Sequence, residues 1–255
     1  MMNYSKSILI LAGLAITCAT PARADGVADL RSALQRFNST TPLKVQVEAR
    51  TWNRKGEGKD LEERHGLANV LVDDGPKGIQ ITYSRDLLNK LDAEEKAKEK
   101  DPKIKTPTIS ALGDVNASNL RSLLSAASSV NFLMEKADFL GEKVDTYQGK
   151  SARLLSFAFN QNRLSESERK YMKKYEGNLD IWIAADGTPL ACKAWQKISS
   201  RAYMVVNFDV KSEEEWQFGI VGDRLVALKK ESKTSGAGMG EKSESKVTKT
   251  LQILN

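Results

Sequence analysis

The chain contains one histidine, two cysteines and no strong excess of charge of either sign. A Ser-His-Asp triad or a multi-histidine metal site needs an imidazole with organised partners. His65 is the single candidate, and the spacing of its neighbours in the sequence supplies no such partners. We therefore interpret His65 as an ordinary exposed strand residue, and a hydrolase that uses it is the least favoured function.

Long apolar segments are also missing, apart from one near the N-terminus. A lysine precedes the apolar run from Ile8 to Cys18, and Ala-Arg-Ala follows at 22–24. This is the pattern of a cleaved secretory signal peptide, and the run is too short for a membrane-spanning helix. We expect residues 1–24 to be the signal peptide and residues 25–255 to form one periplasmic domain. A lipid attached to Cys18 is the alternative for this segment.

Few cysteines and a mild charge exclude further classes of protein. Cleavage leaves Cys192 as the only thiol, so no disulfide can form within the mature chain. Cys192 shares a strand face with Leu190 and Ala194, which predicts a buried, inert thiol. The formal net charge of +6 falls to +4 because one lysine and one arginine leave with the leader. A nucleic-acid footprint needs a clustered basic face, and the scattered excess here predicts no nucleic-acid partner.

The remaining polar clusters form no recognisable chemical site. The acidic runs at 73–74 and 213–215 lack the alternating oxygen ligands of a calcium loop, which favours solvated turns and an edge strand. The glycine-rich residues 235–240 do not lead from a strand into a helix, so they are not a phosphate-binding loop. We therefore expect a non-enzymatic protein that uses no metal and no cofactor.

Hydrophobic periodicity is what the sequence has in abundance. Apolar residues recur at helical spacing from Val27 to Phe37, after a capping aspartate. From Leu43 to Arg50 the period changes to two, as in a half-buried strand. Two more strands reach residue 84, separated by the turn residues at 73–78. The first third of the chain is thus a helix followed by a three-stranded meander.

The middle of the chain predicts helices, and the rest predicts strands. A helix that begins near Leu87 gives way to a charged loop over 92–105, and a second helix spans Asn116 to Lys136. After Ala137 strands dominate, which gives ten or eleven antiparallel strands in all. Because strands and helices do not alternate, we expect a mainly β fold with helices (α+β). The sheet should be strongly curved, or an incomplete β-barrel, with helices on its concave face.

Two tryptophans flank the pair Asp186-Gly187. This pair supplies the positive φ of a tight hairpin turn, and Pro189 is tolerated at the first residue of the returning strand. By alternation, Trp182 points away from the side of Ile181, and Trp195 lies on the same outer side. Two large aromatic side chains there need cover from a helix, from the C-terminal strands or from a partner. Trp182 and Trp195 are therefore the candidate partner-binding residues.

The inward-facing apolar stripes are the candidate lipid-binding surface. A sheet with one continuous apolar face must cover it with helices or fill it with a ligand, and both interpretations stay open. The candidate residues lie on three strands and one helix, and they are Val45, Val47, Ile181, Ile183, Val206, Phe208, Leu120 and Leu124.

With these elements placed, the chain resembles the periplasmic lipoprotein-carrier superfamily, the LolA-like half-barrels. The similarity lies in the leader, in ADLRSALQRF followed by VQVEART, in the two central helical segments, and in ARLLSFAF, LDIWIAADGTPLACKAW and MVVNFDV. It covers residues 25–210 and implies an unclosed barrel whose helix-lidded concave face holds acyl chains. That family has an Arg-Pro after the second strand, where this chain has Asp73 to Pro76, so the lid-securing arginine does not carry over. From Trp216 onward the chain adds two or three strands.

The resemblance favours a periplasmic binding protein that holds an acyl chain or a lipidated partner, in outer-membrane lipoprotein sorting or lipid transport. Its contact with membranes is expected to be transient. The alternative is an envelope interaction or stress-sensor module without lipid cargo. Such a module would present its sheet edges or its charged central loop to a protein partner.

Overall fold

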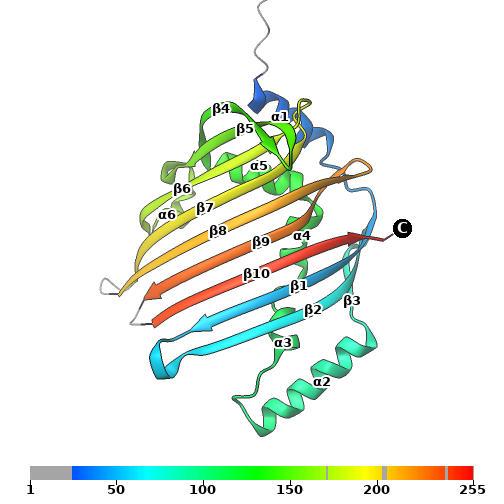
Figure 1. The fold of residues 1–255 in the computed structure, drawn as a ribbon, viewed down its shortest axis with the longest axis vertical. Helices are drawn as coiled ribbons and strands as arrows, with labels where there is room; N and C mark the ends of the chain where they lie inside the picture. The colour runs from blue at the N-terminus through cyan, green and yellow to red at the C-terminus, as the bar shows by residue number, and fades with distance from the viewer. Residues whose placement is uncertain (1–24, 171, 203–205, 239–240, 255) are drawn as a thin grey trace, which may run out of the picture.

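The strands form one open antiparallel sheet. The computed structural model describes residues 25–170, 172–202, 206–238 and 241–254. Within them, ten strands follow the order β3-β2-β1-β10-β9-β8-β7-β6-β5-β4, so β3 and β4 are the two edges and the sheet is not closed (Figure 1). The strands are β1 (Leu43–Lys55), β2 (Glu62–Gly75), β3 (Gly78–Thr82), β4 (Ala137–Tyr147), β5 (Lys150–Phe159), β6 (Met172–Ile183), β7 (Pro189–Ala202), β8 (Val206–Val221), β9 (Arg224–Gly238) and β10 (Glu241–Ile253).

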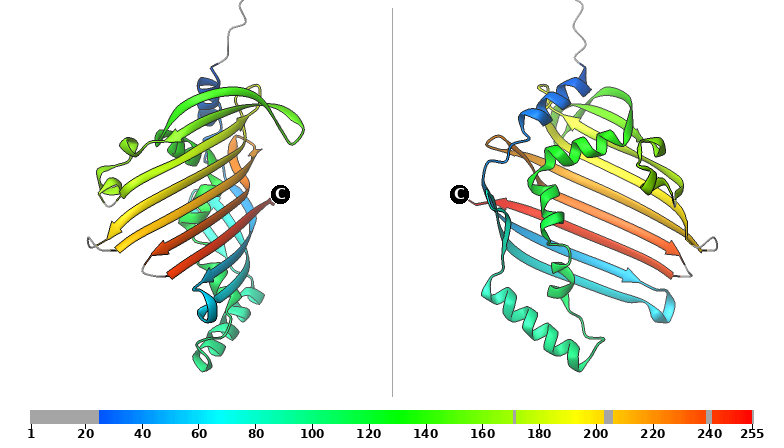
Figure 2. Two further views of the ribbon diagram at one scale, coloured as in Figure 1. Left: turned by 60° about the vertical axis from the view of Figure 1, so that its left-hand side comes forward. Right: turned by 180° about the vertical axis from the view of Figure 1, so that it is seen from behind.

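Helices connect one edge of this sheet to the other. The chain leaves edge strand β3, passes through α2 outside that edge, crosses one face of the sheet through α3 to α5 and enters edge strand β4 (Figure 2). We call the crossed side the helix face, which carries Val47, Ile181 and Trp216, and the other side the open face, which carries Glu48 and Trp182. The helices are α1 (Gly26–Arg36), α2 (Arg85–Lys100), α3 (Pro107–Leu112), α4 (Ala117–Leu124), α5 (Ala126–Glu135) and α6 (Glu166–Arg169), and two 3-10 turns lie at η1 (Gly58–Asp60) and η2 (Gln161–Arg163).

Strand alternation decides which side chains form the core. Along β1, buried side chains alternate with more exposed ones from Leu43 to Thr51, and β6 alternates in the same way from Gly177 to Ile183. A period of two places alternate residues on one face of a sheet. The inward residues form one cluster with Leu30 of α1 and Leu120 of α4. The predicted mainly β fold, with helices at the start and in the middle, is confirmed at this level.

The predicted helix from Asn116 to Lys136 is two helices. Ser125 separates α4 from α5, with φ −125° and ψ 58°, outside the helical region. The segment contains no proline or glycine that would mark this break in the sequence. The cause lies in the tertiary contacts of the α4 C-terminus, which are described with the candidate site.

The charged segment after Leu91 is a helix and not a loop. Residues 93–100 are alanine, glutamate and lysine, all good helix formers, and α2 continues to Lys100. Glu94 also has a tertiary partner, since its carboxylate accepts hydrogen bonds of 2.9 to 3.0 Å from the backbone N–H groups of Thr108 and Ile109. An acidic side chain thus satisfies the free donors at the start of α3.

Strand β8 unites two segments that the sequence separates. Residues 206–217 pair continuously with β7, and β9 lies on the other side of β8, so the acidic run at 213–215 lies in the interior of the sheet and not on an edge strand. β10 pairs with β1 from Val45 to Lys55. The C-terminal strands therefore lie between the first meander and the strands that follow the helices.

The Asp186-Gly187 hairpin is confirmed. Gly187 has φ 83°, and the Thr188 N–H donates to Asp186 Oδ1 at 3.0 Å. The β6–β7 pairing ends at Ile183 and Pro189, so the connection is longer than a two-residue turn. Arg36 of α1 reaches this loop and pairs with Asp186 at 3.1 Å.

The predicted signal peptide, residues 1–24, lies outside the described residues. In the part of the chain that the structure describes, no helix is long and apolar enough to cross a membrane.

Candidate functional site

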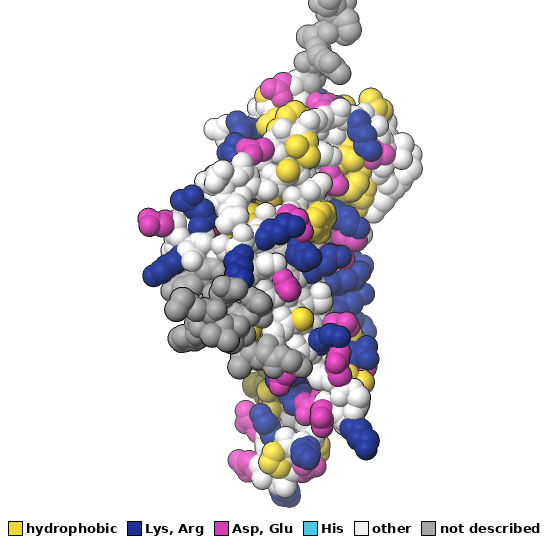
Figure 3. Space-filling view, turned by 90° about the vertical axis from the view of Figure 1, so that its left-hand side faces the viewer, with side chains coloured by type: hydrophobic (Ala, Val, Ile, Leu, Met, Phe, Trp, Pro, Cys, Tyr) yellow, Lys and Arg dark blue, Asp and Glu magenta, His cyan; other side chains and the backbone are white. Residues whose placement is uncertain are grey.

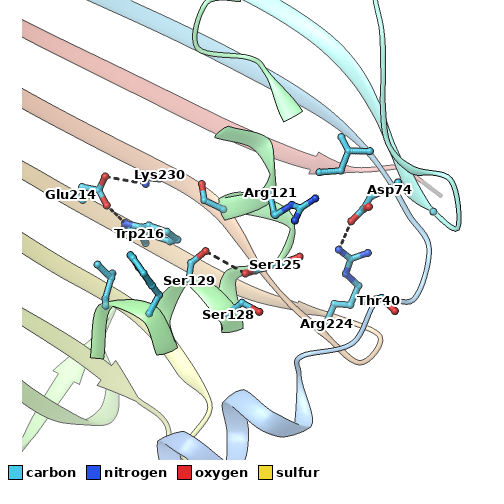
Figure 4. A pocket seen from close by; sticks show the side chains of 16 residues that line it. Thr40, Asp74, Arg121, Ser125, Ser128, Ser129, Glu214, Trp216, Arg224 and Lys230 are labelled. Atoms are coloured by element: carbon cyan, nitrogen blue, oxygen red, sulfur yellow. Dashed lines mark hydrogen bonds and ion pairs between the residues drawn. The ribbon is translucent and has the colours of Figure 1, made fainter. Parts of the chain in front are cut away.

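A cavity of about 700 Å³ lies at the corner between α4 and α5 (Figure 4). Its walls come from both helices, from the β2–β3 turn, and from β8 and β9. Polar side chains gather at two opposite ends of it, one around Arg224 and one around Lys230. Apolar side chains, including Ile79, Phe132 and Leu133, complete the lining.

Arg224 holds the first end together. Its guanidinium is 2% exposed and pairs with Asp74 at 2.6 Å. The same group donates to the backbone carbonyls of Thr41 and Leu124, at 2.7 and 2.9 Å. One buried cation thus ties the start of β9 to the end of β2, the segment before β1 and the end of α4.

This contact explains why α4 ends at Leu124. The last carbonyls of a helix have no partner within the helix and lie at the negative end of its dipole. Arg224 supplies both a donor and a positive charge to the Leu124 carbonyl. The chain then turns at Ser125, and the next residue, Ala126, is fully buried. A partner 100 positions away in the sequence therefore stabilises the break that the sequence pattern does not show.

The second end is built around Glu214 of β8. Its carboxylate pairs with Lys230 of β9 at 3.0 Å and accepts a hydrogen bond of 3.1 Å from Trp216 Nε1. Lys230 Nζ also lies 4.1 Å from the centroid of the Trp216 ring, within the range of a cation–π contact. Trp216 itself is buried, so this end combines an apolar floor with a compensated charge.

Phe132 gives the cavity an exposed apolar surface. It is 55% exposed although it belongs to α5, which otherwise packs on the sheet. Lys136 Nζ lies 4.3 Å from its ring centroid. Leu133 stands next to it on the cavity wall. A large aromatic side chain that stays exposed beside a concave site is a ready contact for an apolar ligand.

Six of the predicted lipid-binding residues lie in the closed core. Each of them is fully buried on the helix face or on α4, and they are Val45, Val47, Ile181, Ile183, Leu120 and Leu124. Phe208 is half-buried near the N-terminal end of β8, and the side chain of Val206 lies outside the described residues. None of the eight lines the cavity as described. The sequence left open whether helices or a ligand cover this apolar face, and at these six residues the helices cover it.

Trp182 and Trp195 lie on the open face, and both are half-buried. Trp182 Nε1 donates to Asp145 Oδ2 at 3.1 Å, and its ring centroid is 6.2 Å from that of Tyr147. The cover for Trp182 therefore comes from the end of β4. Lys and Arg side chains are interspersed with Asp and Glu over the surface seen in Figure 3. A partner-binding role for the two tryptophans stays a prediction.

The residues set aside as chemical candidates have ordinary surroundings. His65 is exposed on β2, with Nε2 at 2.8 Å from Glu63 Oε1. Cys192 is 2% exposed, and burial raises the pKa of its thiol, which disfavours the reactive thiolate. Each carboxylate of the 213–215 run has a lysine partner. Among the described residues, no group of three His, Cys, Asp or Glu side chains could hold a metal ion.

Sequence reasoning missed the cations on the helix face. Lys249 interrupts the apolar stripe of Val247, Leu251 and Ile253, and this break in the alternation was visible in the sequence. Arg224 follows the Gly222-Asp223 turn, and nothing in its local pattern distinguishes it from a solvated arginine. Its importance depends on a partner far away in the chain.

Comparison with protein-family models, curated proteins and solved structures finds no match to this chain.

Proposed function

We propose that the protein is an exported periplasmic carrier that holds an acyl chain, free or on a lipidated partner, in the cavity at the α4–α5 corner. The observation that carries this proposal is Phe132, exposed beside a cavity of about 700 Å³. This volume falls within the range of about 300–1,000 Å³ that is usual for small-molecule sites. Each methylene group moved out of water would contribute about 0.8 kcal/mol.

The half-barrel interpretation belongs to the same proposal. An unclosed sheet with helices across one face suits a half-barrel whose lid is α4 and α5. In the resembling family an arginine after the second strand secures the lid. Here Arg224 connects the end of α4 to Asp74, at the end of β2, and so supplies an equivalent link from another strand. Movement of α4 and α5 would then open and close the cavity.

Phe132→Asp should weaken binding of the neutral dye N-phenyl-1-naphthylamine by about 10- to 100-fold. The substitution removes an apolar side chain worth about 1.5–3 kcal/mol when buried by a ligand. A fluorescence titration measures the effect. Phe139→Asp on β4 is the matched control, since Phe139 is 47% exposed and does not line the cavity. Equal dye affinity in the two variants, or no binding by the unmodified protein, would contradict the proposal.

The alternative is an envelope interaction module that docks through α2. This helix extends beyond edge strand β3 (Figure 1), and only Leu87 of its sixteen residues is buried. Such a helix offers a surface for a protein partner. Deletion of residues 96–105 discriminates between the functions in a pull-down and a dye titration. Loss of partner binding with unchanged dye binding would favour the alternative. The carrier proposal expects the deletion to leave both partner binding and dye binding unchanged.

A further inference from the structure

Two lysines face each other on the helix face of the sheet. Lys249 of β10 and Lys230 of β9 are direct cross-strand partners. Like charges placed directly opposite in a sheet are unfavourable. Glu214 compensates Lys230 at 3.0 Å. No such partner exists for Lys249, whose side-chain ammonium group has no ion pair or hydrogen bond with another described residue.

The position of Lys249 makes this lack of a partner costly. Lys249 is 8% exposed as a residue, and Val247 and Leu251 flank it on the same face of β10. Burial is the main cause that lowers the pKa of Lys249, and the nearby charge of Lys230 acts in the same direction. Asp114 and Glu214 oppose the shift only through their charge. An isolated buried ammonium group is strongly unfavourable, and a bound anion would relieve it.

The cavity of the proposed function adjoins this pair. Lys230 and Trp216 both line it, and Trp216 is the cross-strand partner of Lys230 on the next strand. Lys249 does not itself line the cavity and lies beside Lys230 on the neighbouring strand. An anionic group that contacts both lysines would therefore sit at the Lys230 end of the cavity. A chain attached to that group would extend past Trp216 toward Phe132 and Leu133.

We infer that the ligand is an amphiphile with a carboxylate or phosphate head group, and that Lys249 and Lys230 bind this head. The inference rests on the proposed function and specifies its ligand class. Hydrogen bonds between an ammonium and an anion are charge-assisted and stronger than neutral ones. The head group would thus provide selectivity, and the chain would provide burial of apolar surface.

Displacement of the neutral dye by three ligands of equal chain length tests this inference. Dodecanoate and dodecyl phosphate should bind at least about 10-fold more tightly than dodecanol, below their micelle-forming concentrations. Lys249→Met should remove this preference by weakening the binding of both anionic ligands. Lys246→Met is the matched control, because Lys246 lies three residues before Lys249 on β10, points to the open face and is 45% exposed. Thermal unfolding of each variant checks that it folds.

The outcomes separate the inference from the proposed function. Equal affinity for dodecanoate and dodecanol in the unmodified protein overturns the head-group inference and leaves the carrier proposal standing. Loss of the preference in Arg121→Met but not in Lys249→Met also overturns it, since Arg121 lines the cavity on α4. Calorimetric binding of acetate or inorganic phosphate as tight as that of the amphiphiles would show a free-anion site. No binding of any chain overturns the proposed function itself.

Discussion

Arg224→Met is expected to lower the free energy of unfolding by about 3 kcal/mol. The variant leaves Asp74 without its cation and two backbone carbonyls, of Thr41 and Leu124, without their donor. Removing one partner of a buried ion pair typically costs about 3–5 kcal/mol, because the other charge stays buried. We take the lower end of this range because the Asp74 side chain is 19% exposed.

Thermal and urea unfolding measure this effect. For a chain of this size, about 3 kcal/mol corresponds to a decrease in Tm of roughly 6–12 °C. Arg121→Met is the matched control, because Arg121 is exposed and has no ion pair to another described residue. A surface change of that kind should shift stability by no more than about 0.5 kcal/mol. Equal losses in the two variants would show that the Arg224 contacts contribute nothing specific.

Hydrogen exchange locates the consequence within the molecule. If Arg224 holds the end of α4, its replacement by methionine should accelerate amide exchange more in α4 than in α1, because the Arg224 side chain donates a hydrogen bond to Leu124 of α4 and none to α1. Uniform acceleration over both helices would instead mean that the variant is destabilised as a whole. The comparison thus tests whether α4 is the element that this arginine secures.

Gly187→Ala is expected to destabilise the protein by about 3 kcal/mol. Gly187 has φ 83°, where a residue with a Cβ is strained by about 1–2 kcal/mol. An added Cβ would also overlap the backbone carbonyl of Asp29 in α1. Overpacking of this kind costs about 1–3 kcal/mol, since backbone must move. Denaturant unfolding monitored by circular dichroism checks the sum.

Gly222→Ala separates the two causes. Gly222 lies in the β8–β9 turn with φ 59°, and a Cβ added there meets no atom within 4 Å. This control therefore carries the backbone strain without the overlap and should lose about 1 kcal/mol. If Gly187→Ala is no worse than Gly222→Ala, α1 does not press on the hairpin as closely as described.

Local sequence patterns were sufficient to assign the strands and the Asp186-Gly187 turn. The alternation of Leu43 to Arg50 and of Leu179 to Ile183 assigned the strands and their inward sides, because a period of two is a property of neighbouring residues. The Asp186-Gly187 pair assigned the turn for the same reason. The break at Ser125 was missed because helix propensity and periodicity continue through it.

The candidate site depended on contacts between distant parts of the chain. Arg224 and Asp74 are 150 positions apart, and Lys249 meets Lys230 only because β10 pairs with β9. Six of the eight predicted lipid contacts were inward-facing as expected, yet α1 and the α3–α5 segment cover that face. Whether an apolar stripe meets a helix or a ligand is decided by what packs on it.

Local sequence was enough to assign the mainly β fold class, the inward side of the strands and the glycine turns, since each follows from residues within a few positions. Folding of the whole chain set the strand order, the end of α4 and the position of the cavity, and it left Lys249 without an ion pair among the described residues. These features arise from long-range pairing and burial, which bring together charges and carbonyls that have no relation along the chain.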